Sequence, residues 1–244
     1  MGLISTAALS LPILTLVATR LAGYKTFPAL VVYYGSAVAY NLLTQGYVKA
    51  DAGIIRAVGF TNNLLDAPLT MTFLLYFSTS PKLASNMKIL IGAFIGFEAL
   101  IVLIFGFTRL AMTIILGPGL IAVLCFSIPF FVSQTKMSIM HHKSTGKAFM
   151  SASLLFAYGC FIIIYVIYYL LNIRNTEDAF LVFFLVSTVS SLLMSIGMFI
   201  ERKRVKKLSE LKVVRKELSE LYSNDKPAAP LRPAYFDFDK DQWN

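Results

Sequence analysis

Charged residues are scarce in this chain. Of its 244 residues, 14% are Asp, Glu, Lys or Arg, 57% are hydrophobic, and the mean hydropathy is +0.70. A soluble domain carries roughly a quarter charged residues, so this composition excludes an ordinary soluble protein. The net charge of +9 comes mostly from short basic islands between apolar stretches, and it therefore predicts no binding to nucleic acid.

Cysteine and histidine are also rare. The two cysteines, Cys125 and Cys160, both fall within apolar stretches, and their number excludes a disulfide framework or a metal site of several cysteines. We interpret both as small packing residues. The two histidines, His141 and His142, are adjacent in a basic segment that we interpret as a solvated loop. We therefore predict no metal site and no catalytic residues of the Ser-His type.

The chain does contain a series of apolar stretches of about twenty residues, the length that an α-helix needs to cross ~30 Å of hydrocarbon. Stretches such as "FIIIYVIYYLL" are apolar on every face, unlike the alternating strands of an outer-membrane barrel. We predict an all-α polytopic membrane protein that folds as a seven-transmembrane-helix bundle. The predicted spans are Leu3–Leu21, Pro28–Val48, Ile54–Phe77, Met87–Phe107, Leu110–Val132, Ala148–Leu171 and Ala179–Ile200.

The basic residues are distributed unevenly between these spans. The segment "RKRVKK" follows the last span, and Lys136, Lys143 and Lys147 lie between the fifth and sixth spans. Cytoplasmic loops carry an excess of Lys and Arg. We therefore predict an outside N-terminus, a cytoplasmic C-terminus and a multi-pass location in the plasma (cytoplasmic) membrane.

The distribution of apolar and charged residues divides the chain into three segments. Residues 1–200 form the seven-helix transmembrane domain, residues 201–223 a polybasic amphipathic cytoplasmic helix, and residues 224–244 a flexible acidic-aromatic tail. Basic side chains of the second segment are predicted to contact the bilayer through anionic lipid headgroups. These membrane-surface residues are Arg202, Lys203, Arg204, Lys206 and Lys207.

The polybasic segment also has an apolar seam. Leu211, Val214, Leu218 and Leu221 recur at the three- and four-residue steps of a heptad pattern. One interpretation is a helix that extends from the last span along the anionic membrane face, and the other is a dimerisation stem. Residues 201–244 are therefore the candidate contact for a homo-oligomer or for a cytoplasmic protein.

The stretch "NNLLDAPLT" is unusual for a membrane helix. Asn62, Asp66 and Thr70 are four residues apart, which places them on one helical face. Asp66 lies near the middle of its span, Glu98 is equally deep in the next, and no Lys or Arg is deep in any span. An unpaired charge at the bilayer centre costs at least ~2.5–3.5 kcal/mol, so we expect Asp66 to face the bundle interior in its neutral form.

Other spans contribute polar side chains that can meet this face. Small and hydroxylated residues are also the usual means by which membrane helices pack, so packing is the competing explanation. The predicted ligand-binding or proton-linked pocket consists of Asn41, Asn62, Asp66, Glu98, Tyr158 and Ser187.

The stretch at 62–70 resembles the third-helix motif of microbial rhodopsins, in which Pro68 matches the helix proline. Asn62 then falls on the Schiff-base counter-ion position. In the sixth span, "FAYGCF" is similar to the family pattern around the pocket tyrosine, which Tyr158 matches. The resemblance implies a seven-helix fold. However, Val189 stands where the family has its retinal-binding lysine, so covalent retinal and light-driven pumping are not expected.

The sequence leaves three hypotheses for function. The first is a receptor, sensor or accessory scaffold that binds a ligand in the polar pocket and reports through its cytoplasmic segment. The second is a small-solute or ion transporter or channel, in which Pro12 and Pro118 or Pro129 are hinges. The third is an intramembrane enzyme acting on lipid, which we favour least because no Ser-His or metal-ligand set accompanies the two acids. The sequence names neither a cofactor nor a ligand.

Overall fold

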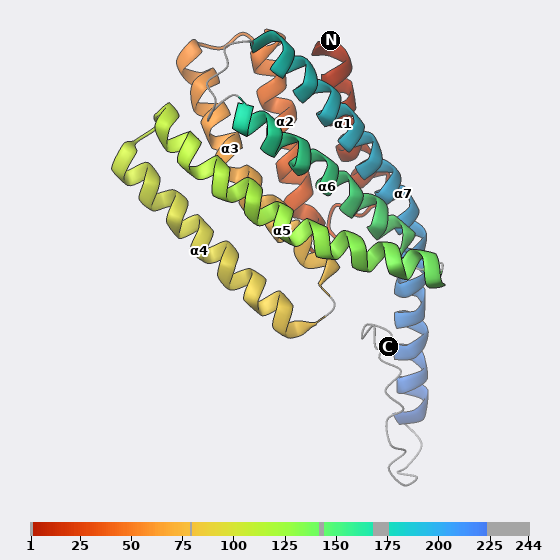
Figure 1. Cartoon of the computed structure of the whole chain (residues 1–244). Helices are drawn as coiled ribbons and strands as arrows, with labels where there is room; N and C mark the ends of the chain where they lie inside the picture. Colours follow the sequence, from red (N-terminus) through yellow and green to blue (C-terminus); the bar gives the residue numbers. More distant parts are fainter. Residues whose placement is uncertain (1, 79, 142–143, 168–175, 224–244) are drawn as a thin grey trace.

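The computed structural model describes residues 2–78, 80–141, 144–167 and 176–223, and all regular elements in these ranges are helical (Figure 1). Seven α-helices occupy the positions of the seven predicted spans, and a short 3₁₀ helix, η1, follows α3. The elements are α1 (Gly2–Thr19), α2 (Phe27–Thr44), α3 (Ala52–Leu74), η1 (Leu75–Phe77), α4 (Pro81–Phe105), α5 (Arg109–His141), α6 (Thr145–Tyr165) and α7 (Thr176–Ser223).

Four of the described helices are long and apolar enough to cross a membrane. They are the stretches Pro81–Phe105, Arg109–Met140, Thr145–Tyr165 and Leu181–Ser219, and α1 contributes a shorter apolar stretch at Leu3–Thr19. The sequence-based prediction of transmembrane segments is confirmed to this extent. The helices have the length and composition of segments that cross a bilayer, so the apolar side chains on their outside suit a lipid-facing surface.

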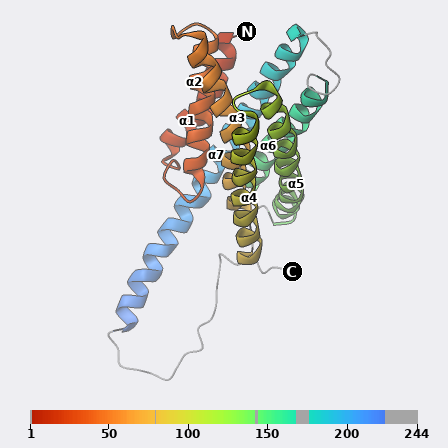
Figure 2. The ribbon, with the colours of Figure 1, turned by 90° about the vertical axis from the view of Figure 1, so that its left-hand side faces the viewer.

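Six of the helices form a closed ring. Following the contacts, α1 packs on α2, α2 on α3, α3 on α5, α5 on α6, α6 on α7, and α7 returns to α1. The remaining helix, α4, packs outside this ring against α3 and α5, and Figures 1 and 2 show it at the edge of the bundle. Only 17% of the most apolar stretch of α4 is buried, compared with 44% in α7, so α4 is the least enclosed of these spans.

Local sequence explains where several helices begin and end. Asp51 caps α3 by accepting a hydrogen bond from the Gly53 amide at 3.1 Å, and Ser80 caps α4 through the Leu83 amide at 3.1 Å. Side-chain oxygens at these positions satisfy amides that have no partner within the helix. Pro81 occupies the first turn of α4, and Gly106 ends the helix with φ of 63°.

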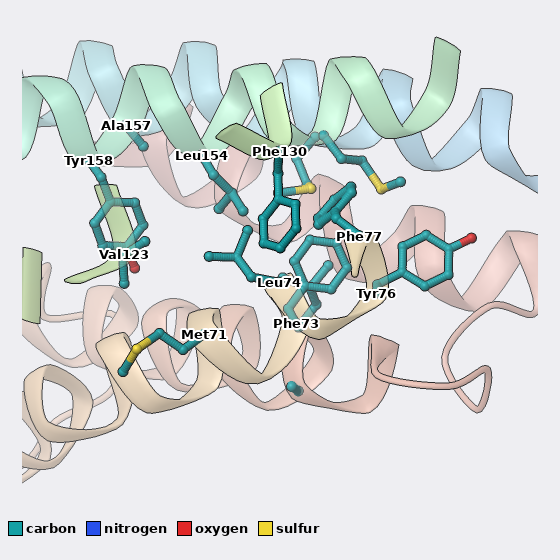
Figure 3. Close-up of a cluster of buried hydrophobic side chains, with 14 of the residues drawn as sticks. Met71, Phe73, Leu74, Tyr76, Phe77, Val123, Phe130, Leu154, Ala157 and Tyr158 are labelled. Carbon is teal, nitrogen blue, oxygen red and sulfur yellow. The ribbon is translucent and has the colours of Figure 1, made fainter. Parts of the chain in front are cut away.

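An apolar layer fills the ring on the side of the α6 amino terminus (Figure 3). Aromatic rings of α3 and η1 pack edge to face within it; the Phe73 and Phe77 centroids are 5.3 Å apart. The layer includes fully buried side chains from α3, η1, α5 and α6. Its labelled members in Figure 3 include Met71, Phe73, Leu74, Phe77, Val123, Phe130 and Leu154.

Glycines allow α6 and α7 to approach closely. A Cβ atom at Gly146 would lie 2.7 Å from the Glu201 amide nitrogen, and one at Gly197 would lie 2.9 Å from the Gly146 carbonyl oxygen. Both distances are shorter than a van der Waals contact, so only glycine fits at this crossing. Small residues at helix crossings are the usual basis of close packing in membrane proteins.

The described helices differ from the predicted spans mainly in α7. We predicted a span ending at Ile200 and an amphipathic helix over residues 201–223, and in the structure both belong to α7, which runs without a break from Thr176 to Ser223. Residues 201–223 contain neither proline nor glycine, which are the common causes of helix breaks. The predicted tail, residues 224–244, and the end of the sixth span lie outside the described residues.

Candidate functional site

The candidate site begins at Asp66, in the middle of α3. The Tyr158 hydroxyl of α6 donates a hydrogen bond to Asp66 Oδ1 at 2.8 Å, and it lies 2.7 Å from Thr70 Oγ1. Tyr158 is 1% exposed and Thr70 is 0% exposed, whereas Asp66 itself is half-buried. The structure therefore places Asp66 as the sequence predicted, against a polar group of the sixth span.

A pair of tyrosines faces the triad from α2. Tyr33 interacts with the Asp66 carboxyl group, and its neighbour Tyr34 interacts with Ser191 of α7. Tyr34 is buried, and its ring packs edge to face on that of Tyr33, with centroids 5.0 Å apart. Asp66 consequently connects α3 with both α2 and α6 inside the ring.

Glu98, in α4, approaches Asp66 from outside the ring. Its side chain is 6% exposed, and its Oε1 atom has no hydrogen-bond partner among the described residues. Asp66 and Glu98 both line a small cavity of about 10 Å³. A cavity of ~10–15 Å³ on this measure holds one water molecule, so water can reach both carboxyl groups here but an organic solute cannot. The remaining lining residues are Asn63, Ala67, Ile115, Leu116, Gly119 and Leu120.

The two helices next to this cavity, α3 and α5, pack closely, and each contains a proline. A Cβ atom at Gly119 would lie 3.0 Å from Ala67 Cβ, so α3 and α5 approach closely beside the cavity. Pro68 and Pro118 lie within these two helices. A proline has no amide hydrogen and leaves the carbonyl four residues earlier without its helical donor, here those of Leu64 and Ile114. Each of the two helices beside the cavity therefore carries one backbone carbonyl without its helical donor.

The other predicted pocket residues lie elsewhere. The side-chain carbonyl oxygen of Asn62 accepts a hydrogen bond from Ser36 at 3.0 Å, which joins α2 to α3. The Asn41 amide donates to Thr6 at 3.1 Å and to Ser5 at 3.4 Å, which joins α1 to α2. Ser187 is buried in α7. The structure brings Asp66, Glu98 and Tyr158 together, whereas Asn41 and Asn62 form helix-packing hydrogen bonds of their own.

A second polar cluster lies where α7 leaves the bundle. Tyr76 of η1 donates a hydrogen bond to Glu201 Oε1 at 2.6 Å, and Arg204 forms an ion pair with the same oxygen at 3.2 Å. Glu201 is 1% exposed, and the Lys147 ammonium group lies 4.8 Å from the centre of the Tyr76 ring. The sequence did not predict this cluster. Its only signal is a single acid placed directly before five basic residues.

The predicted membrane-surface residues surround this cluster. Arg202, Lys203, Lys206 and Lys207 are exposed, whereas Arg204 is about one-third exposed and bound to Glu201. Lys206 also pairs with Glu210 at 3.9 Å, and both side chains are well exposed. Exposed pairs of this kind contribute at most ~1 kcal/mol, so the basic side chains remain available to lipid phosphates.

The carboxyl groups of this site can bind a proton and pass it from one oxygen to another. A neutral Asp66 can donate toward the cavity while it accepts from Tyr158, and Glu98 offers an acceptor oxygen on the opposite wall. Within the described part of the chain, no three His, Cys, Asp or Glu side chains are grouped as a metal site would require. The chemistry of the described site is therefore that of a carboxyl pair with a tyrosine partner.

Comparisons of this chain with protein-family models, with curated proteins and with solved structures found no match. The resemblance to microbial rhodopsins remains a prediction from two short motifs. Any function must accordingly be argued from the carboxyl pair, its partners and the helices that hold them.

Proposed function

We propose that this protein is a multi-pass membrane sensor whose responsive group is the carboxyl pair Asp66 and Glu98. The observation that carries the proposal is the position of Asp66, between the Tyr158 hydrogen bond and a water-sized cavity that it shares with Glu98. A carboxyl group at membrane depth is costly, which favours a functional role over simple packing. The cavity volume favours protons as the signal over an organic ligand.

Separate polar contacts join α7 to α6 and to η1. Tyr158 and Ser153 lie on α6, and the Ser153 hydroxyl donates to the Ser190 carbonyl of α7 at 2.8 Å. Farther along α7, Tyr76 is bonded to Glu201 at the point where α7 leaves the bundle. A change in the Asp66–Tyr158 hydrogen bond would shift α6 against α3, and the close α6–α7 crossing would carry this shift to residues 201–223. This connection supports the sensor over the passive scaffold.

The predicted orientation suits such a sensor. Tyr24, in the α1–α2 connection, packs edge to face on Tyr76 with centroids 6.3 Å apart, so this connection lies at the same end of the bundle as Glu201. Arg20 and Lys25 belong to that connection, and they add positive charge to the end that carries the polybasic segment. The positive-inside rule then favours a cytoplasmic C-terminus, an outside N-terminus and seven spans in the plasma membrane.

A proton-coupled transporter or channel is the second candidate, and the prolines favour it. Pro68 and Pro118 each remove one backbone hydrogen bond from the two helices that border the cavity, and proline-containing helices are candidate hinges in a transporter. The apolar layer beside Tyr158 argues against a continuous polar path through the ring in the described conformation. Proteoliposomes containing a pH-sensitive dye separate the two functions. A sensor leaves the internal pH unchanged after an external pH step, whereas a transporter changes it and loses this activity on Asp66→Asn.

The carboxyl pair is tested by infrared spectroscopy of the protein in lipid nanodiscs during a pH titration. We expect a carbonyl-stretch band from a buried protonated carboxyl group, which disappears or shifts in Asp66→Asn and in Glu98→Gln. Glu210→Gln is the matched control, because Glu210 is well exposed in α7 and should leave this band unchanged. If the buried band is identical in the wild type and in both site variants, the proposal is wrong.

A further inference from the structure

The last part of α7 projects beyond the rest of the bundle. Residues 201–223, which we call the stem, continue α7 without a break past the ends of the other helices (Figures 1 and 2). Large apolar side chains of the stem are uncovered: Leu211 is 44%, Val214 49% and Leu218 46% exposed. Clustered apolar surface of this kind marks an interaction site rather than a solvated helix.

The uncovered side chains lie on one side of the stem, turned away from the bundle. With ~3.6 residues per turn, the row formed by Leu211, Val214 and Leu218 lies roughly 150° around α7 from the buried residues that face α1 and α6. The exposed apolar residues of the upper part of α7 lie roughly 70° around the helix from this row. These residues include Leu185, Leu192 and Phe199, which are spaced seven apart. Because the stem projects beyond the other helices, a partner helix can approach it along the row without meeting the bundle.

Charges beside the row fit a second copy of the same helix. If Leu211 and Leu218 are a positions and Val214 is a d position, then Glu210 is a g position and Arg215 is the e position of the next heptad. In a parallel two-stranded coiled coil, a g residue faces the e residue five positions later on the partner helix. Glu210 of one chain would then face Arg215 of the other in both directions, which is the self-complementarity that a two-fold dimer needs.

One residue in the row is basic. Lys207 precedes Leu211 by one turn and lies in the same row, so a parallel pairing brings two ammonium groups near each other. In the register above Lys207 is a d position, and like charges facing each other there lower the stability of the pairing. Because Lys207 belongs to the basic segment beside the apolar span, anionic lipid phosphates can balance this charge.

We infer that the stem binds a second copy of this chain in a parallel, in-register homodimer along the Leu211–Val214–Leu218 row. The competing occupant is the membrane surface. A helix that lies on the surface must bend where it leaves the spanning segment, but α7 is continuous there and contains no proline or glycine between residues 201 and 223. This inference does not depend on the proton-sensing role, since it concerns only the stem.

Cysteine crosslinking of the full chain in native membranes tests the inference. In a background of Cys125→Ala and Cys160→Ala, Leu211→Cys should form a disulfide-linked dimer under mild oxidation. Ser209→Cys is the matched control, because Ser209 is exposed on the opposite side of the same turns and should crosslink several-fold less. Equal crosslinking of the two variants, or none in either, would overturn the inference.

A charge exchange tests the parallel register without altering the apolar row. In nanodiscs or detergent, Glu210→Lys should lower the dimer fraction several-fold, because it places lysine against Arg215 of the second copy. The double variant Glu210→Lys with Arg215→Glu should restore the dimer. If the single change leaves the dimer fraction unaltered, or if the double variant stays monomeric while remaining folded by circular dichroism, the in-register dimer is wrong.

Discussion

At the scale of single residues, the contacts of Asp66 explain how an acid is accommodated inside the bundle. Tyr158 donates to its carboxyl group, Thr70 lies beside Tyr158, and Glu98 faces the shared cavity. None of these neighbours is basic, so the neutral acid is the form that this environment stabilises. The absence of a basic neighbour among the described residues supports the proposal that Asp66 responds to protons.

The Tyr158 hydroxyl should contribute measurably to stability. Tyr158→Phe removes the donor to Asp66 and the contact with Thr70, and interhelical hydrogen bonds in membranes are worth roughly 0.6–1.7 kcal/mol each. We expect a lower midpoint in thermal unfolding of the detergent-solubilised protein. Tyr47→Phe, at an exposed position, serves as the control and should be neutral. A Tyr158→Phe variant as stable as the wild type would show that this hydrogen bond is not formed.

At the scale of elements, the proposed sensor depends on the close crossing of α6 and α7 as the link between the carboxyl pair and the stem. The Gly146→Ala substitution places a Cβ atom 2.7 Å from the Glu201 amide nitrogen, and backbone atoms cannot move aside as a flexible side chain can. Overpacking of this kind costs typically ~1–3 kcal/mol. We expect Gly146→Ala to lower thermal stability by this amount.

Gly159→Ala, in the same helix, is the matched control because no neighbouring atom lies within 4 Å of the position that its Cβ atom would take. Alanine favours a helix over glycine by up to ~1 kcal/mol, so Gly159→Ala should be neutral or stabilising. Circular dichroism melting of the two variants in the same detergent checks both expectations. Equal stability of the two variants would contradict the tight crossing.

The positions of the helices along the sequence were largely predictable, whereas the packing of one helix against another was not. Uninterrupted apolar stretches locate each helix, and the four-residue spacing of Asn62, Asp66 and Thr70 predicts their shared face. Periodicity along one helix carries no information about which helices adjoin it. For this reason Asn41 and Asn62 were assigned to the pocket, although they bond to Ser5, Thr6 and Ser36 instead.

The cluster at the base of the stem was missed for a related reason. Glu201 begins a charged segment, which is usually solvated, and only the packing of η1 and α6 around it buries the carboxyl group. The position of α4 outside the ring was equally beyond prediction, because its sequence is as apolar as that of α5. Both features depend on tertiary contacts that single-sequence patterns do not contain.

At the scale of the whole molecule, the orientation in the membrane decides whether the stem can report to the cytoplasm. In a background without the two native cysteines, Thr176→Cys should react with a membrane-impermeant thiol reagent added to intact cells. Thr176 begins α7 at the end of the helix remote from the stem. Lys82→Cys, near the start of α4, should react only after the cells are opened. The reverse pattern of labelling would overturn the predicted topology.

The central claim, that protonation of the carboxyl pair moves the stem, can be tested by one distance measurement. Spin labels at Lys82→Cys, near the start of α4, and Ser209→Cys, in the stem, report the separation of the bundle and the stem by pulsed electron paramagnetic resonance. Labelled protein is diluted with unlabelled protein in nanodiscs so that only distances within one chain are detected. The account predicts that the distance distribution shifts with pH in the wild type and stays fixed in Asp66→Asn. An unchanged distribution in the wild type, or the same shift in both proteins, would contradict it.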